Sequence, residues 1–141
     1  MIIETMKVLV VEPEKEPYVK EISSGLSSLQ KEVGGFIEAV YPFEDPVAII
    51  CNEEGKLEGL PLNRALRDED GHVYDIIAGT FLSAGLSEDN FCSLDDAQIE
   101  KFSALYKTPE LFMRLGNRTL VIPAEEKPAA DKERKGADVE R

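Results

Sequence analysis

The sequence predicts an α+β domain with a mainly antiparallel sheet of about five strands, one inserted helix and two C-terminal helices. Short β-branched runs bounded by proline and glycine recur as far as residue 82, which is typical of an antiparallel meander. One segment between these runs and two later segments instead carry apolar residues at helical spacing. The 141 residues, 43% of them hydrophobic, suit one domain with a single core.

The N-terminal third is expected to form a strand, a second strand and a helix. Met6 opens a β-branched run that ends at Val11, before a proline turn, and residues 18–22 form the next strand. Ser23 or Ser24 can cap the helix that follows, and its apolar positions lie on one face. That face consists of Leu26, Leu29 and Val33, and Gly34 supplies the stop.

The middle of the chain is expected to add three strands and one helical turn. Residues 36–41 and 47–51 form two strands separated by an acidic proline turn. Residues 62–67 form no more than a helical turn behind an asparagine cap. Residues 73–82 form a central strand, apolar on both faces, in which Gly79 suggests a bulge or a close approach of another group.

The C-terminal part is expected to contain the two packed helices. Ser93 and Asp96 form an approximate capping box before an apolar face that includes Phe102 and Tyr106. Thr108 and the proline after it start a second, short helix that runs through Leu115 and ends at Gly116. Residues 119–122 add an edge strand.

These elements divide the chain into three parts. Residues 1–5 are expected to be a flexible lead-in, residues 6–123 one acidic domain, and residues 124–141 a disordered charged tail with no apolar face to bury. The formal net charge is −12, and residues 1–123 hold 22 acidic against 11 basic side chains. The acidity therefore belongs to the domain rather than to the tail.

Composition excludes several classes of function. The negative field repels phosphate backbones, so no direct contact with nucleic acid is expected. The apolar runs are far shorter than a membrane span, and the first residues lack a basic leader, so we expect a cytoplasmic protein with no membrane partner. The two cysteines, Cys51 and Cys92, stand far apart in the sequence, and the chain has a single histidine, His72, so no metal site or cofactor is expected. Both thiols should be reduced and partly buried.

One cluster of residues suggests a site: Asn63 and Arg64 in the segment 62–67, together with Asp75, Gly79 and Thr80 in the strand that follows. Arg64 offers a planar fork suited to a carboxylate or phosphate, and Asp75 interrupts an apolar strand. The structural alternative is an ion pair between Arg64 and Asp75. The functional alternative is a small anionic ligand or a partner's carboxylate held by Arg64, Asn63 and the backbone of Gly79.

The same strings carry a resemblance to a known family. The chain resembles a bacterial and phage family, domain of unknown function 3846. The resemblance rests on three strings in this order: Tyr-Pro at 41–42, at the end of a predicted strand, Pro-Leu-Asn-Arg-Ala-Leu at 61–66, and Ile-Ala-Gly-Thr-Phe at 77–81. The likeness spans roughly residues 6 to 106. It implies an accessory protein of a mobile element or phage, singles out Asn63, Arg64, Gly79 and Thr80, and implies no particular activity.

The best hypothesis is a non-enzymatic binding or interaction module whose partner is an unknown protein or a small anionic ligand. One alternative is an acidic decoy that mimics nucleic acid and occupies a DNA-binding protein, which requires a continuous stripe of carboxylates. Another is a small hydrolase or transferase that uses Asp75 and Arg64 near Thr80, which requires one open pocket that joins them. No catalytic residue is assigned, and the oligomeric state stays open.

Overall fold

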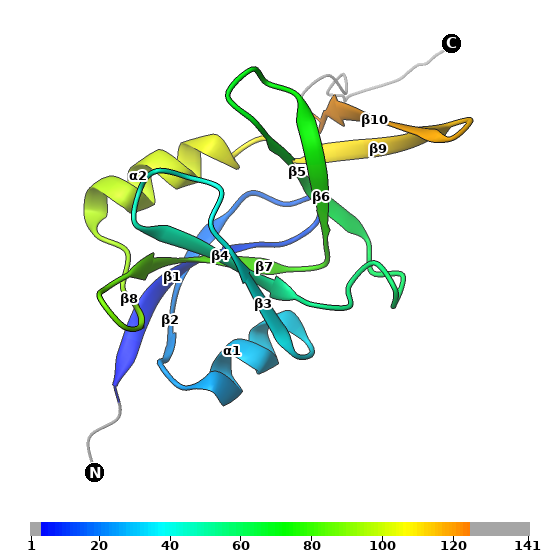
Figure 1. The fold of residues 1–141 in the computed structure, drawn as a ribbon. Helices are drawn as coiled ribbons and strands as arrows, with labels where there is room; N and C mark the ends of the chain where they lie inside the picture. Colours follow the sequence, from blue (N-terminus) through cyan, green and yellow to red (C-terminus); the bar gives the residue numbers. More distant parts are fainter. Residues whose placement is uncertain (1–3, 125–141) are drawn as a thin grey trace, which may run out of the picture.

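The computed structural model describes residues 4–124, and within this range the chain is mainly antiparallel β-structure with ten strands and two helices (Figure 1). The first strand already begins at Thr5. The predicted lead-in and tail therefore fall mainly on residues 1–3 and 125–141, which lie outside the described residues.

A six-stranded antiparallel sheet forms the centre of the fold. β1 (Thr5–Val11) pairs on one side with β2 and on the other with β7, as the β-branched run at its centre predicts. The full path is β2 (Tyr18–Ser23), β1, β7 (Phe81–Leu86), β4 (Val47–Asn52) and β3 (Ile37–Val40), with the short β8 (Phe91–Cys92) paired to β7.

The two helices cover opposite faces of this sheet (Figure 1). Because successive side chains of a strand alternate between faces, Val8 packs with α1 (Leu26–Val33) whereas Leu9 packs with α2 (Asp96–Leu105). α1 ends at Gly34, as predicted, but Gly25 precedes it in place of a serine cap. α2 has its capping box two residues further along the chain than predicted, at Asp95 and Gln98.

Two separate two-stranded ribbons complete the fold. The first pairs β5 (Leu62–Arg67) with β6 (Val73–Ala78), and the second pairs β9 (Glu110–Leu115) with β10 (Arg118–Pro123). In Figure 1 the second ribbon crosses beside the first, and β9 contacts β5. Residues of β5, of the start of β9 and of the end of α2 line one depression.

The predicted fold class is wrong in its C-terminal part, because the second C-terminal helix does not exist. The segment predicted as that helix is β9, which pairs with β10 in a register that places Leu115 opposite Arg118. Gly116 and Asn117, between two apolar runs, are a hairpin-turn signature, and Gly116 has a φ of 66°. The predicted edge strand at 119–122 lies within β10.

The expected central strand at 73–82 is two strands in two different sheets. Gly79 has a φ of 85°, and this left-handed residue ends β6 and turns the chain into β7. The segment 62–67, expected to be a helical turn, is β5, and it pairs with β6 around the turn at 68–71. Gly79 is therefore a joint between the ribbon and the central sheet rather than a bulge within one strand.

Candidate functional site

Arg64 lies in β5 with its side chain buried inside the protein, and the residue is 2% exposed. Nη1 donates to Oδ1 of Asn63 at 2.8 Å, and Nη2 donates to the carbonyl oxygens of Lys15 at 2.7 Å and Tyr106 at 2.8 Å. These bonds tie β5 to the β1–β2 connection and to the end of α2. The segment predicted as a helical turn at this position is therefore a largely buried strand.

Asn63 holds this arrangement in place. It is fully buried, and its Nδ2 donates to the carbonyl oxygens of Val11 and Gly79, both at 2.8 Å. Its Oδ1 is the acceptor for Arg64. Asn63 thus joins β1, the Gly79 joint and the guanidinium of Arg64, and it positions the arginine rather than facing solvent.

The charge of Arg64 has no counter-ion within the described part of the chain. Its bonded partners are carbonyl and amide oxygens, and no carboxylate among residues 4–124 forms an ion pair with it. Burial lowers the pKa of Arg64, and the charge of Glu110 partly offsets this effect. Because a guanidinium stays protonated in proteins, a positive charge is buried here.

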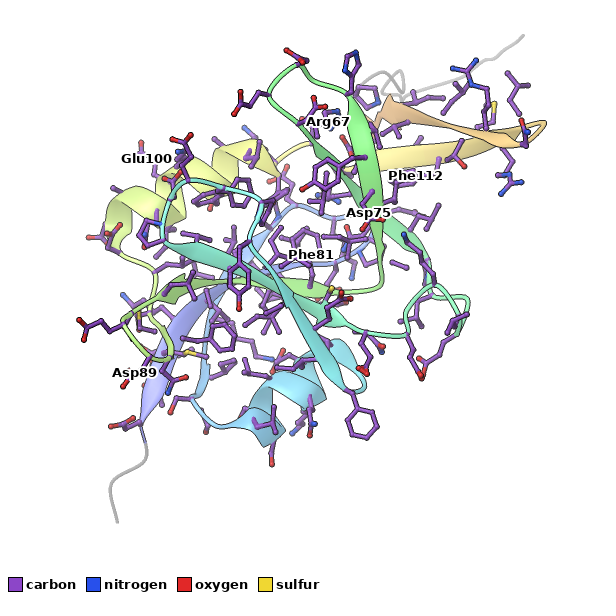
Figure 2. The ribbon with its side chains drawn as sticks, in the orientation of Figure 1. Arg67, Asp75, Phe81, Asp89, Glu100 and Phe112 are labelled. Atoms are coloured by element: carbon purple, nitrogen blue, oxygen red, sulfur yellow. The ribbon has the colours of Figure 1, made fainter. Side chains whose placement is uncertain are left out.

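Two buried polar atoms at this place also lack a hydrogen-bond partner among residues 4–124. They are Nε of Arg64 and the hydroxyl oxygen of Tyr106, a residue that is 4% exposed at the end of α2. The Tyr106 ring packs edge-on against Phe81, which is labelled in Figure 2, with ring centroids 5.2 Å apart. Burial raises the pKa of Tyr106 well above its usual range, so the hydroxyl keeps its proton.

Both residues line one depression of about 120 Å³, which we call the Arg64 depression. Its walls come from β5, the end of α2, the start of β9 and the segment before β4. The apolar side chains that line it include Pro42, Phe43 and Leu105, and the polar ones are Arg64, Arg67, Tyr106 and Glu110.

Glu110 already shows how this region binds a carboxylate. Its Oε1 accepts from the backbone N–H of Ala65 at 2.8 Å, and its Oε2 accepts from Nη1 of Arg67 at 3.0 Å (Arg67 is labelled in Figure 2). Glu110 and Arg67 therefore neutralise each other. The charge of Arg64 is left over, and the depression is a positive spot in an acidic protein.

Residues 6–107 match the model of a family described as a domain of unknown function, DUF3846. The chain belongs to this family. The matched segment contains Asn63, Arg64 and Tyr106, and it ends before Glu110 and the β9–β10 ribbon. No curated protein and no solved structure matches the chain.

Asp75, a predicted partner of Arg64 in this DUF3846 member, lies elsewhere. It is exposed on β6 (Figure 2), where its carboxylate forms an ion pair with Lys56 and accepts the N–H of Ile76. Arg64 and Asp75 do not pair within residues 4–124, so the ion pair predicted as the structural alternative is wrong. Arg64 is instead held by backbone carbonyls.

The Lys56–Asp75 pair is expected to contribute little to stability. Both side chains are about half exposed, at 58% and 49%, and exposed ion pairs typically contribute less than about 1 kcal/mol. We therefore expect Asp75→Asn, which keeps the acceptor for Ile76, to change the free energy of unfolding in urea by less than about 1 kcal/mol. A loss near 3 kcal/mol or more would contradict this assignment.

Gly79 and Thr80 are not presented to a ligand in the predicted way. The N–H of Gly79 donates to the carbonyl oxygen of Pro61 at 2.7 Å, and its own carbonyl accepts from Asn63. Thr80 is half-buried beside Pro61 in a different, shallower depression. The structure brings Asn63, Arg64 and Gly79 together and leaves Asp75 and Thr80 outside that group.

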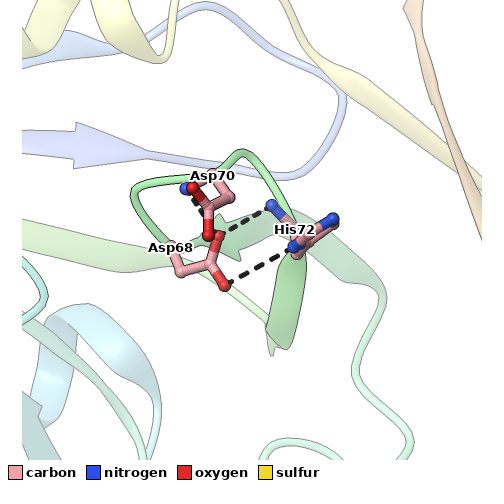
Figure 3. A group of neighbouring side chains, drawn as sticks. All are labelled: Asp68, Asp70 and His72. Carbon is pink, nitrogen blue, oxygen red and sulfur yellow. Dashed lines mark hydrogen bonds and ion pairs between the residues drawn. The ribbon is translucent and has the colours of Figure 1, made fainter.

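The turn between β5 and β6 gathers Asp68, Asp70 and His72, whose potential ligand atoms lie within 4.8 Å of one another (Figure 3). All three residues are exposed. Oδ1 of Asp68 accepts the backbone N–H groups of Asp70 and His72, each at 2.9 Å. The cluster is accounted for by a turn that an aspartate side chain caps.

Cys51 and Cys92 are both free thiols, and Cys51 is buried whereas Cys92 is half-buried. Burial, with the nearby charge of Glu38, raises the pKa of Cys51 to about 11, so its thiol is unreactive near neutral pH. Among the described residues, no helix is long and apolar enough to cross a membrane.

Sequence reasoning missed three residues of the Arg64 depression. Tyr106 was assigned to the packing face of a helix, Glu110 to a helix that does not form, and Arg67 to a helical turn. The hairpin signature at Gly116 and Asn117 would have placed Glu110 at the start of a strand. No local sequence pattern predicts that β9 contacts β5.

Proposed function

We propose that this DUF3846 member is a non-enzymatic binding module of the cytoplasm, and that it receives an anionic group of a ligand or protein partner in the Arg64 depression. One observation carries the proposal: a buried guanidinium, without a counter-ion among residues 4–124, belongs to a residue that lines a depression, and its Nε–H lacks a hydrogen-bond partner in the same range. The family resemblance alone suggests that the module is an accessory protein of a mobile element or phage.

The energetics favour occupation by an anion. Burying an unpaired charge costs several kcal/mol even after relaxation, on the order of the values measured for broken buried ion pairs. The carbonyl acceptors of Lys15 and Tyr106 and the Asn63 amide offset part of this cost. An anion in the depression would satisfy both the charge and the unused Nε–H, and low local polarity strengthens such contacts.

An enzyme built on the predicted residues finds less support. The hydrolase or transferase hypothesis required one open pocket that joins Arg64, Asp75 and Thr80. Arg64 lines the Arg64 depression, whereas Asp75 lines two other depressions and Thr80 lines a fourth. A binding role needs only the Arg64 depression.

The decoy hypothesis is also less well supported, because the exposed carboxylates are spread over the molecule. Figure 2 shows Asp75, Asp89 and Glu100 on three separate parts of the fold. Exposed acidic residues occur on most connections as well as on α2, and they include Glu14, Glu16, Glu53, Glu54, Glu58, Glu69, Asp70, Glu88, Asp89 and Glu100. Phosphate mimicry requires a continuous stripe rather than this distribution.

Anion binding should stabilise the folded state. A ligand at ten times its Kd adds about 1.4 kcal/mol, which raises the thermal midpoint of a domain this size by several degrees. We expect 100 mM sodium acetate to raise the midpoint by about 3–8 °C over sodium chloride at equal ionic strength.

The matched control is Arg64→Lys, which keeps a positive charge able to reach the same carbonyls but loses the Nε–H and the planar fork. The acetate-specific rise should disappear in this variant. An equal rise in both proteins would indicate a general salt effect. That result, or the absence of a rise in the wild-type protein with both sodium acetate and sodium phosphate, would contradict the proposed function.

A further inference from the structure

This inference rests on the proposed function and names the chemistry of the occupant. We infer that the group received in the Arg64 depression is a singly charged carboxylate on a short aliphatic stem, bound by Nε–H of Arg64 and the hydroxyl of Tyr106. The net charge and the lining of the depression favour such a carboxylate over a phosphate dianion.

Size favours a small anion on a short stem. The depression measures about 120 Å³, whereas a drug-sized ligand needs about 300 Å³ or more.

Charge points the same way. The ionisable side chains that line the depression, Arg64, Arg67 and Glu110, carry two positive charges and one negative charge, a net of +1. A monoanion brings this sum to zero. The second negative charge of a phosphate would face the carboxylate of Glu110, whose own cation is already engaged.

The lining supplies a place for the aliphatic stem. Phe43 and Leu105 line the depression, and Phe43 packs on Phe102 with ring centroids 4.7 Å apart, which fixes that wall. Leu105 is 55% exposed, and exposed side chains change rotamer within nanoseconds, so this wall can adjust to a ligand. Methylene groups would contact these two side chains while the carboxylate lies deeper.

Tyr106 adds the second donor. Its hydroxyl is buried and lacks a hydrogen-bond partner among residues 4–124, although buried hydroxyls normally have one. With Nε–H of Arg64 it gives two donors for the two oxygens of one carboxylate. Both atoms belong to residues that line the same depression, although the residues are 42 positions apart in the chain.

The probes are sodium butyrate, sodium phosphate and butylammonium chloride, titrated into the full chain and followed by calorimetry. We expect butyrate to bind with a Kd on the order of millimolar, as befits a ligand of a few atoms, phosphate at least about tenfold more weakly, and butylammonium not at all. Butyrate, N-acetyl-alanine and N-acetyl-glutamate amide then represent a free acid, a chain end and an acidic side chain. The tightest of the three identifies the source of the carboxylate.

Tyr106→Phe separates binding from folding. The lost hydroxyl has no partner among the described residues, so the thermal midpoint should stay equal or rise, while butyrate affinity should fall about tenfold. Tyr41→Phe is the matched control, because Tyr41 is exposed and does not line the depression. It should change neither quantity.

The outcomes separate the two proposals. If phosphate binds as tightly as butyrate or more tightly, or if Tyr106→Phe leaves butyrate affinity unchanged, the carboxylate inference is wrong while the binding module stands. If neither anion binds the wild-type chain, both proposals are wrong.

Discussion

Replacing Arg64 with methionine is expected to lower the free energy of unfolding by about 1–3 kcal/mol, because the lost hydrogen bonds outweigh the relief of the buried charge. The change removes the donors to Asn63, Lys15 and Tyr106, of which Asn63 and Tyr106 are buried residues whose oxygens then lose this partner. Methionine fills a similar volume, so the loss reports the hydrogen bonds rather than a cavity. Urea denaturation followed by circular dichroism measures it.

The matched control is Arg67→Met, three residues along the same strand. Arg67 is 41% exposed, and its ion pair is with Glu110, so we expect a loss of about 1 kcal/mol or less. Equal losses for the two variants would mean that Arg64 is not the link between β5, α2 and the β1–β2 connection.

Gly79→Ala is expected to cost about 2 kcal/mol. The φ of 85° is strained for any residue with a Cβ, and a Cβ at this position would lie 2.7 Å from Cδ1 of Leu60, which must then move. The carbonyl of Gly79 accepts from Asn63, which in turn accepts from Arg64, so a backbone shift at Gly79 would extend to the positioning of Arg64.

Gly71→Ala isolates the two contributions. Gly71 has the same φ of 85°, but a Cβ there meets nothing within 4 Å. Its cost should be the backbone strain alone, about 1 kcal/mol. If both alanine variants lose the same stability, the contact with Leu60 contributes nothing and Gly79 is required only for its backbone conformation.

The first half of the fold was predictable because its signals are local. The β-branched run before Val11 and the helical spacing ended by Gly34 each allow one structure, and both form. The segment that starts at Glu110 was ambiguous, since its apolar residues suit either a helix or a strand. The pairing of Leu115 with Arg118 across the turn decided it, and that is a property of two segments together.

The site was predictable in residue type but not in partner. Asn63 and Arg64 stood out because a planar fork beside a capping amide suggests an anion site. Asp75 was predicted as the partner because it interrupts an otherwise apolar strand, where an unpaired carboxylate would be costly to bury. The actual acceptors of Arg64 include the carbonyl of Tyr106, and a backbone carbonyl leaves no trace in residue type.

Absence of a counter-ion is likewise invisible in the sequence, because this chain has an excess of carboxylates. Only the fold shows that Glu110, which lines the same depression as Arg64, is already bound to Arg67 and the backbone of Ala65. The proposed function follows from that occupied carboxylate as much as from the arginine. The depression keeps a net positive charge in an acidic protein because its one carboxylate, Glu110, is paired with Arg67 and leaves Arg64 without a counter-ion among residues 4–124.

The most direct test follows the Nε–H resonance of Arg64 in a ¹H–¹⁵N spectrum while sodium butyrate is added, with the resonance assigned from its loss in Arg64→Lys. We expect this signal to move progressively and to saturate, because a hydrogen bond to a carboxylate forms at an atom that lacks a partner among residues 4–124. A resonance of Arg64 that stays in place, while exposed groups such as Arg118 shift, would contradict an anion site at Arg64.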